Sequence, residues 1–436
     1  MPYKAGGRLG SERASKLNHI DVVNSPLVNK LLEEFEHPKN DEVDSSEFKS
    51  NNIPEGEKPF SHVFAIDGSI QHINSSNEGV LRQLAFIKTA MFRLDQKKLN
   101  DLNPVAPHPL ALKKIMHDSA MFHATVFPLR NIKLGDNSVY GSVRQIIFES
   151  IKDPKLENGS FSIFETLKWL AYQKWDNTPK LSPSFDCPHC GEKIDGLIYD
   201  SDKGECKKCN NEVYLTDMLG FHLEMGEESA PGSVASAYMM IHETLFLFAG
   251  IRYLWVSNQK DLFERCLFIK DGPLNLRSQY VKLIDPIRNF LDYAEKDGTN
   301  IYICGQEKTG LFVDHLDLIE KRMHNDSYFL PSNEYIRKHV QQRKAEEKYG
   351  FRTNYGNKVF IKIGNHHKMV LMIPTGKYLD SSSCDDFIGF NRIVGTIKSI
   401  LSYKHENALI PIEMAHGIAS LSTYPSASIF KLFAGL

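Results

Sequence analysis

The sequence predicts a protein of the mixed α/β class, and three features support this prediction. The runs SHVFAIDGS and CLFIKDGPL are short and apolar and are followed by Asp-Gly, as expected of buried strands. The segment from Ala235 to Trp255 is apolar on nearly every side, which is typical of a buried helix. The C-terminal third adds the strand-like runs TNIYICGQEKTG, NKVFIKIG and MVLMIPTG and then a helical pattern around IPIEMAHGIASLS. Between the first two strands we expect helical stretches and a cysteine module.

The composition is that of a globular protein with a large core, because the chain has 436 residues and is 42% hydrophobic. The apolar segment contains His242, Glu243 and Arg252 and is therefore not an uninterrupted membrane span. The N-terminus has no apolar block like that of a secretory signal, so we expect a cytoplasmic location. The net charge of -2 lacks the strong basic excess of a free-standing nucleic-acid binder.

The chain is expected to divide into a core with one insertion and an N-terminal extension. Residues 1–58 are predicted to form a helix, from Val22 to Phe35, and a flexible linker. The cysteine module defines an insertion at 181–215, so that residues 59–180 and 216–436 together form the core.

Two CxxC pairs give the most specific local signal in the chain. Cys187 and Cys190 form the first pair, Cys206 and Cys209 the second, and residues 191–205 separate them, as in a zinc ribbon. Four thiolates complete a tetrahedral shell and leave no open position for water, so the predicted zinc ion is structural. His189, between the first two cysteines, is expected to be a solvent-facing spacer.

Two aspartates have the placement that a metal-dependent nuclease requires. Asp67 and Asp271 each follow an apolar run and precede a glycine, which leaves room for a phosphate backbone. For either aspartate alone, ordinary turn chemistry is the simpler interpretation. Glu243 lies in the apolar helix and must therefore bind metal or find a partner in the core. Glu149 and Glu165, in other helix-like segments, are alternatives to Glu243.

Two residues nearer the C-terminus are weaker candidates. His416 lies in a helix of small residues, where spacing alone indicates a core histidine. Lys308 follows the strand-like run in ICGQEKTG, where a lysine either contacts a phosphate or is solvated. The basic segment 334–352 is expected to be a solvated helix or loop.

Five of these motifs, taken in order, resemble the NurA nuclease family: VFAIDGS, IHETLFLFAGIRYL, CLFIKDGPL, ICGQEKTG and IPIEMAHGIASL. The resemblance extends from about Phe60 to the C-terminus. Each motif is short, but five in the family's order are far more specific than any one of them. The zinc ribbon and the acidic segment before Lys58 depart from the simplest members of the family.

The resemblance implies a ribonuclease H-like core and a manganese- or magnesium-dependent nuclease that acts on DNA ends and single strands. It also implies a homodimer and a hexameric HerA ATPase as partner. By position, Asp67, Glu243 and Asp271 match the metal-binding acids and His416 matches the late active-site histidine. Lys308 is a weaker match to a lysine that contacts substrate.

The predicted mechanism is phosphodiester hydrolysis by water activated on a metal held by Asp67 and Asp271. Glu243 would complete a two-metal site, and His416 would orient or protonate groups near the scissile phosphate. The enzyme would serve DNA repair or anti-phage defence, and a translocase that threads DNA into it would explain the nearly neutral net charge. Two alternatives remain at this point: a non-catalytic adaptor that binds DNA or the ATPase, and another ribonuclease H-like nuclease without a translocase.

Overall fold

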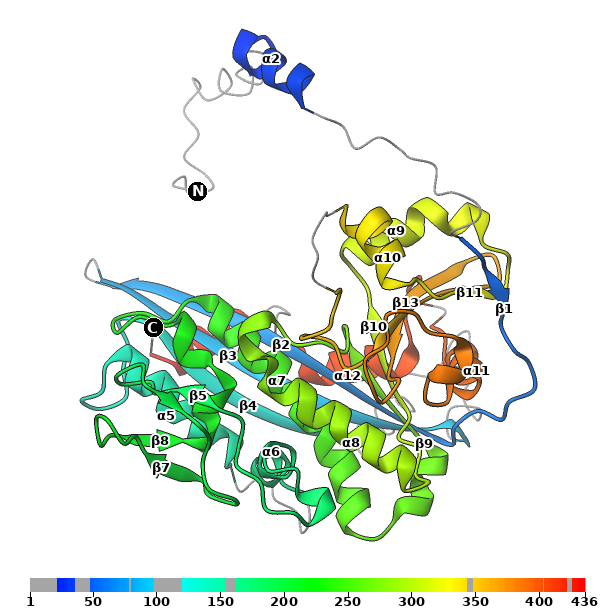
Figure 1. Cartoon of the computed structure of the whole chain (residues 1–436). Coiled ribbons are helices and arrows are strands. Elements are labelled where there is room, and N and C mark those ends of the chain that lie inside the picture. The colour runs from blue at the N-terminus through cyan, green and yellow to red at the C-terminus, as the bar shows by residue number, and fades with distance from the viewer. Residues whose placement is uncertain are drawn as a thin grey trace. The chain divides into compact units, whose positions relative to one another are not determined.

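A mixed sheet of nine strands lies at the centre of the computed structural model (Figure 1), which describes residues 22–35, 48–77, 80–97, 120–153, 161–342, 348–402, 404–421 and 426–435. The strand order is β1-β11-β12-β13-β10-β9-β2-β3-β4. The strands are β1 (Asn51–Asn52), β2 (His62–Asn77), β3 (Val80–Asp95), β4 (Ala120–Arg130), β9 (Cys266–Asp271), β10 (Ile303–Glu307), β11 (Ser327–Phe329), β12 (Asn357–Ile363) and β13 (His367–Ile373). The predicted mixed α/β class is confirmed.

The mode of strand pairing changes twice across the sheet. β2, β3 and β4 form an antiparallel meander, whereas β9 runs parallel to β2 and β10 runs parallel to β9. From β10 onward, β13, β12, β11 and β1 are again antiparallel to their neighbours. The two strands expected to carry aspartates are therefore central, adjacent and parallel.

Helices cover both faces of the sheet. α7 packs on β2 and β3, and α12 also packs on these two strands (Figure 1). The helices of the larger unit are α5 (Val139–Ile151), α6 (Ile163–Ala171), α7 (Gly232–Val256), α8 (Ile284–Lys296), α9 (Leu311–Ile319), α10 (Asn333–Tyr335), α11 (Phe390–Ser399), α12 (Ile410–Ala419) and α13 (Ser426–Phe433). Short 3-10 segments are η3 (Lys174–Asp176), η4 (Leu215–Leu219), η5 (Phe221–Glu224), η6 (Lys260–Arg265), η7 (Ser278–Leu283), η8 (Glu320–Arg322) and η10 (Cys384–Asp386), and η9 (Ile336–Gln341) is a π-helix.

The chain divides into two units, Met1–Phe48 and Lys49–Leu436. In the first unit, α2 (Pro26–Glu34) confirms the predicted helix, and its leucines at positions 27, 31 and 32 are exposed. The predicted linker lies largely outside the described residues. In the second unit, α10 and η9 occupy the start of the basic segment 334–352, of which residues 343–347 lie outside the description.

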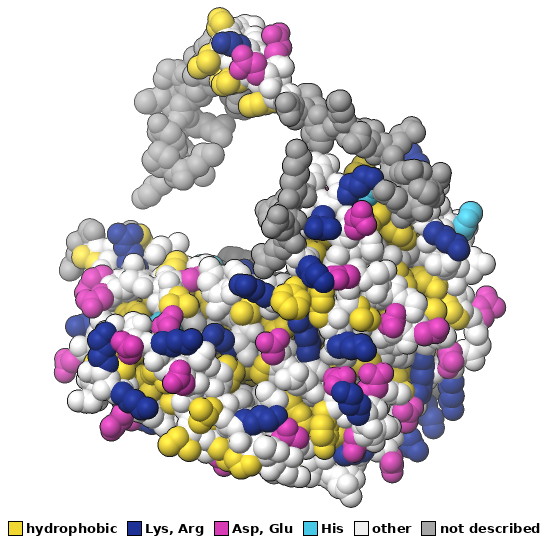
Figure 2. Space-filling view, viewed as in Figure 1, with side chains coloured by type: hydrophobic (Ala, Val, Ile, Leu, Met, Phe, Trp, Pro, Cys, Tyr) yellow, Lys and Arg dark blue, Asp and Glu magenta, His cyan; other side chains and the backbone are white. Residues whose placement is uncertain are grey.

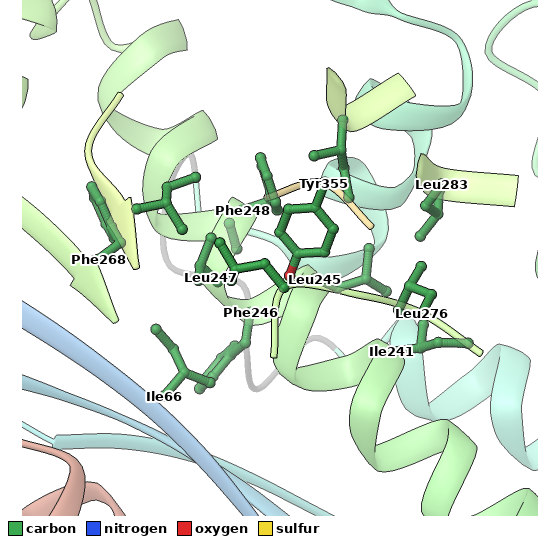
Figure 3. Close-up of a cluster of buried hydrophobic side chains, with 14 of the residues drawn as sticks. Ile66, Ile241, Leu245, Phe246, Leu247, Phe248, Phe268, Leu276, Leu283 and Tyr355 are labelled. Carbon is green, nitrogen blue, oxygen red and sulfur yellow. The ribbon is translucent and has the colours of Figure 1, made fainter. Parts of the chain in front are cut away.

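α7 is a core helix, as its composition predicts. Ile241, Leu245 and Phe246 are completely or almost completely buried, and Ile66 of β2 points into the same cluster (Figure 3). Truncation of such an aromatic side chain to alanine costs about 3–5 kcal/mol. Among the described residues, α7 alone is long and apolar enough to cross a membrane, but 78% of its most apolar stretch is buried within the protein.

Two expectations about the N-terminal part of the sheet are wrong. β2 does not end at Asp67, because the strand continues through Gly68 to Asn77 and pairs with β3 along its whole length. The segment before the cysteines is not wholly helical, since β3 and β4 occupy 80–95 and 120–130. The first half of β3, from Val80 to Lys88, is less buried than its second half, from Thr89 to Asp95.

Candidate active site

Strand register brings Asp67 and Asp271 together. Ile66 pairs with Lys270 across the parallel strands β2 and β9, so the next residue on each strand is one of the two aspartates. Side chains alternate along a strand, and the aspartates therefore point away from α7, toward which Ile66 points (Figure 3). Asp271 also pairs with Gln306 of β10, which extends the row by one polar residue.

His416 joins this row from α12. Its Nδ1 donates a 2.7 Å hydrogen bond to Oδ2 of Asp67, while the backbone amide of Gly68 donates to Oδ1, also at 2.7 Å. Burial, and then the negative charge of Asp271, raise the pKa of Asp67 in spite of these two donors. The expected core histidine is in fact largely exposed, and its ring is held at the site.

Lys308 approaches Asp271 from the end of β10. Its Nζ lies 2.8 Å from Oδ2 of Asp271, and the lysine side chain is partly exposed. Each aspartate thus has one side-chain nitrogen as a partner, from His416 for Asp67 and from Lys308 for Asp271. The contact with Asp271 brings Lys308 to the site. An ion pair alone does not show that the lysine binds substrate, so that role stays a prediction.

Glu243 lies on the α7 side of the sheet. Its Oε2 pairs with Nζ of Lys270 at 2.9 Å, and both side chains are almost wholly buried. Burial raises the pKa of Glu243 to about 7, although the positive charge of Lys270 opposes this shift. Its other oxygen lies against Gly68, where an added Cβ would be only 2.7 Å away. Glu243 is close to the aspartates, but its partner in this structure is a lysine, and its role as a metal ligand stays a prediction.

A cavity of about 660 Å³ opens beside Asp271. Asp271, Lys308 and His416 line one end of it. Val313, Leu316, Met369 and Val370 form an apolar wall. Charged groups of both signs line the rest, with Lys368, Lys404 and His405 as basic groups and Glu307, Glu406 and Glu413 as acidic ones. Apolar walls with a few charged groups are typical of sites that bind small molecules or nucleotides.

The row of oxygen atoms fits a hard divalent cation. Carboxylates and amide carbonyls are the protein ligands that magnesium and manganese prefer. Burial, and after it the negative charge of Asp271, raise the pKa of Asp67, and a bound cation would relieve the repulsion between the two carboxylates. Gln306 is 1% exposed, and its Oε1 has no hydrogen-bond partner among the described residues. Asp67, Asp271 and Gln306 each present a side-chain oxygen on this face.

The four cysteines form a separate cluster that could hold a metal ion. The Sγ atoms of Cys187, Cys190, Cys206 and Cys209 all lie within 4.8 Å of one another. The backbone amides of Cys209 and Lys208 lower the pKa of the Cys206 thiol to about 6, which favours the thiolate that a metal needs. The structure therefore brings together the four cysteines of the two CxxC pairs, and their role as zinc ligands stays a prediction.

The two knuckles repeat the same backbone turn. The amide of Gly191 donates to the carbonyl of Cys187, and the amide of Asn210 donates to that of Cys206. Gly191 and Asn210 both have positive φ, of 71° and 54°. The small paired strands of the lobe are β5 (Phe185–Asp186), β6 (Lys193–Ile194), β7 (Lys203–Glu205) and β8 (Glu212–Tyr214). His189 lies outside the cluster and its ring contacts the carbonyl of Glu212.

The cysteine lobe is fixed to the core through α5. Arg144 donates from Nε and Nη2 to the two carboxylate oxygens of Asp217, both at 2.8 Å, and its Nη2 also donates to the carbonyl of Glu212. The Arg144 guanidinium lies 4.2 Å from the centre of the Tyr214 ring. A bidentate pair of this kind is geometrically specific, so the lobe is rigidly attached.

No protein-family model matches the chain, and no curated protein matches it. Among solved structures, the chain is similar to the NurA nuclease from Sulfolobus solfataricus, with 10% identity, 98% of this chain and 97% of that chain covered, and a TM-score of 0.33. A structure of NurA bound to dAMP and manganese is 10% identical, with 98% of each chain covered and a TM-score of 0.28. A structure of NurA with manganese is 11% identical, with the same coverage and a TM-score of 0.26. These structures belong to the family that the motifs resemble, but likeness at this level carries no argument about function.

Sequence reasoning missed two residues at the site, Lys270 and Gln306. Both lie in strand-like runs. Gln306 becomes notable only when register places it beside Asp271, and Lys270 only when α7 provides Glu243 as its partner. The signal for Lys270 was a lysine inside CLFIKDGPL, a run otherwise apolar enough to be buried. The signal for Gln306 was its position two residues before Lys308.

Proposed function

We propose that this protein is a manganese- or magnesium-dependent deoxyribonuclease that hydrolyses phosphodiester bonds at the site of Asp67 and Asp271. The observation that carries the proposal is the meeting of these two carboxylates on one face of adjacent parallel strands, where Asp271 borders a cavity lined by charged groups of both signs. Catalysis on nucleic-acid backbones by metals held between acidic residues is a recurrent use of this arrangement.

Each residue would have a separate task. A divalent cation bound by Asp67 and Asp271 would lower the pKa of water and polarise the phosphate. Asp67 holds Nδ1 of His416, which leaves Nε2 to exchange a proton near the scissile phosphate. Lys308, held near Asp271, would attract a phosphate oxygen. The proposed ligands of the structural zinc are the four clustered cysteines.

We further propose that the core is ribonuclease H-like. The order β4-β3-β2-β9-β10 supports this assignment, since an antiparallel meander is followed by two strands parallel to its first strand. The acids also support it, because one lies on the first strand of the meander and the other at the end of the neighbouring parallel strand.

The test is degradation of end-labelled linear DNA with manganese, with magnesium and with chelator. Cleavage that needs the metal and is lost in Asp67→Ala and Asp271→Ala, but not in the exposed Asp136→Ala, supports the proposal. Circular single-stranded DNA distinguishes an endonuclease from an exonuclease that requires an end. Cleavage that survives both substitutions would place the site elsewhere, and no cleavage in any condition would favour a non-catalytic adaptor.

A hexameric HerA-type translocase is the proposed partner, in DNA repair or anti-phage defence. Basic and acidic side chains are interspersed on the face shown in Figure 2, in line with the net charge of -2. Such a surface gives weak non-specific attraction to DNA, so a motor that delivers DNA would be useful. The exposed leucines of α2 offer contacts for a protein partner. Co-purification with an ATPase tests the partner, and light scattering tests the proposed homodimer.

A further inference from the structure

A buried lysine lies directly behind the two aspartates. Nζ of Lys270 is 2.9 Å from Oε2 of Glu243, and the two side chains are only 4% and 6% exposed. The same ammonium donates to the backbone carbonyl of Asp271 at 3.2 Å. A fixed positive charge therefore joins the glutamate of α7 to the strand end that presents Asp271.

We propose that Lys270 takes the place of a second metal ion in this site. Each chain then binds one divalent cation, at Asp67 and Asp271, while Glu243 stays with Lys270. This inference rests on the proposed nuclease function, because it concerns the metal of the same site. It replaces the two-metal arrangement expected from the sequence, and Lys270 is a positioning residue that does not touch the substrate.

The charges of the site match one divalent ion. As the 2.9 Å ion pair of an ionised Glu243 with a protonated Lys270, the two side chains together carry no net charge. Asp67 and Asp271 contribute two negative charges, which one divalent cation neutralises. Lys308 already adds a positive charge beside Asp271. A second divalent ion would therefore bring two uncompensated positive charges close to two lysines, at a site where Asp67 and Glu243 are largely shielded from water.

Burial also holds Glu243 where it is. If Glu243 moved to a metal, Lys270 would remain as a buried ammonium, and the nearest other acid, Asp271, has its carboxylate paired with Lys308. An uncompensated buried charge is strongly unfavourable. Glu243 also fills the space beside Gly68, because a Cβ there would lie 2.7 Å from Oε1. The glutamate is packed in place as well as paired.

The first experiment counts bound manganese on the full chain, with the metal of the cysteine cluster retained. Electron paramagnetic resonance during a manganese titration gives the number of ions, and thiolates compete little for manganese because they prefer softer metals. We expect one ion per chain, which is lost in Asp67→Ala. Two ions per chain that are both lost in Asp67→Ala would overturn the inference. This measurement needs no substitution in the buried pair.

Substitutions in the pair test the role of each residue. The double variant Lys270→Met/Glu243→Gln removes both charges of the pair and should change the manganese Kd less than threefold, whereas Glu243→Gln alone would leave Lys270 as an uncompensated buried ammonium. Weakening by tenfold or more in the double variant would identify Glu243 as a ligand and overturn the inference. Lys270→Met frees Glu243, so a second, weaker manganese should bind and should disappear in the double variant Lys270→Met/Glu243→Gln. A single bound manganese ion in Lys270→Met would show that Lys270 is not what excludes a second ion.

Lys168→Met is the matched control, because Lys168 is another buried lysine, and its partners Asp200 and Asp202 do not line the cavity beside Asp271. The number of manganese ions bound by this variant should stay at one.

Failures of the two proposals are distinguishable. One bound ion without DNA cleavage would refute the nuclease function alone, two ions with cleavage would refute the inference alone, and no bound manganese in the wild type would refute both.

Discussion

His416 donates a 2.7 Å hydrogen bond from Nδ1 to Oδ2 of Asp67, although 349 positions separate the two residues in the chain. The Asp67 side chain is 7% exposed and the His416 side chain 59% exposed. The buried carboxylate therefore fixes one edge of an imidazole whose other edge reaches the cavity. A histidine oriented in this way is prepared to transfer a proton to or from a bound molecule.

His416→Ala should reduce the nuclease rate by about 10²–10⁴-fold, the usual contribution of a general acid or base. Manganese binding should change little, because the two aspartates remain. The matched control is His189→Ala, since His189 is exposed on the cysteine lobe and lies outside the metal cluster. A rate of DNA cleavage within threefold of the wild type in His416→Ala would show that this histidine only packs against Asp67.

Gly68→Ala should disturb the site from the α7 side of the sheet. An added Cβ would lie 2.6 Å from Cγ of Met239 and 2.7 Å from Oε1 of Glu243, so α7 must shift or its side chains must rearrange. Overpacking of this kind costs about 1–3 kcal/mol. We expect a lower free energy of unfolding in urea and a lower rate of DNA cleavage. Gly141→Ala is the control, because its Cβ would meet its nearest neighbour at 3.5 Å. Equal stability of the two variants would contradict this account.

The parts of the site that lie in one segment could be predicted from the sequence. Asp67, Asp271 and the four cysteines follow local patterns, in which an apolar run or a CxxC spacing limits what the residues can do. The buried helix could be predicted equally well, because an apolar stretch of that length has few other structural interpretations. These predictions needed no knowledge of the chain's tertiary path.

Relationships between segments could not be predicted. Lys270 lies in a strand that looks apolar, and only the packing of α7 on that strand gives it Glu243 as a partner. Gln306 joins the site through parallel pairing with Asp271, which the sequence of either strand does not encode. β3 was missed because VLRQLAFIKTAMFRLD mixes helix-forming and strand-forming residues, and pairing with β2 decides its structure.

Cys206→Ser should release the structural metal and destabilise the protein by at least about 3 kcal/mol, since the ion binds only the folded lobe. Zinc content by atomic absorption and the urea midpoint should fall together. Cys384→Ser is the control, because Cys384 lies outside the cluster of four thiols. Full stability after loss of the metal would mean that the contacts of Arg144 with Asp217 and Glu212 suffice to hold the lobe together.

Acid should destabilise the fold through its buried histidines. Burial lowers the pKa of His315 from 6.5 to about 4, and its Nε2 lies 2.8 Å from the Tyr335 hydroxyl. Burial also lowers the pKa of His123 and, further, that of His242, which stack with ring centres 4.8 Å apart. A group whose pKa is lower in the folded state binds fewer protons there than in the unfolded chain. Its stabilising effect is therefore complete above about pH 6.5 and is lost as the pH falls toward 4.

For His315 alone this loss amounts to about 3 kcal/mol between pH 6.5 and 4, because each tenfold change in proton affinity corresponds to roughly 1.4 kcal/mol. His315→Gln cannot titrate but still offers the Tyr335 hydroxyl a hydrogen-bond partner. Its free energy of unfolding in urea should therefore fall less steeply with decreasing pH than that of the wild type. His405→Gln is the control, because the His405 side chain is 60% exposed. Identical pH slopes for His315→Gln and the wild type would mean that His315 is protonated within the fold as readily as in the unfolded chain, and that the acid sensitivity arises at His123, His242 or the carboxylates.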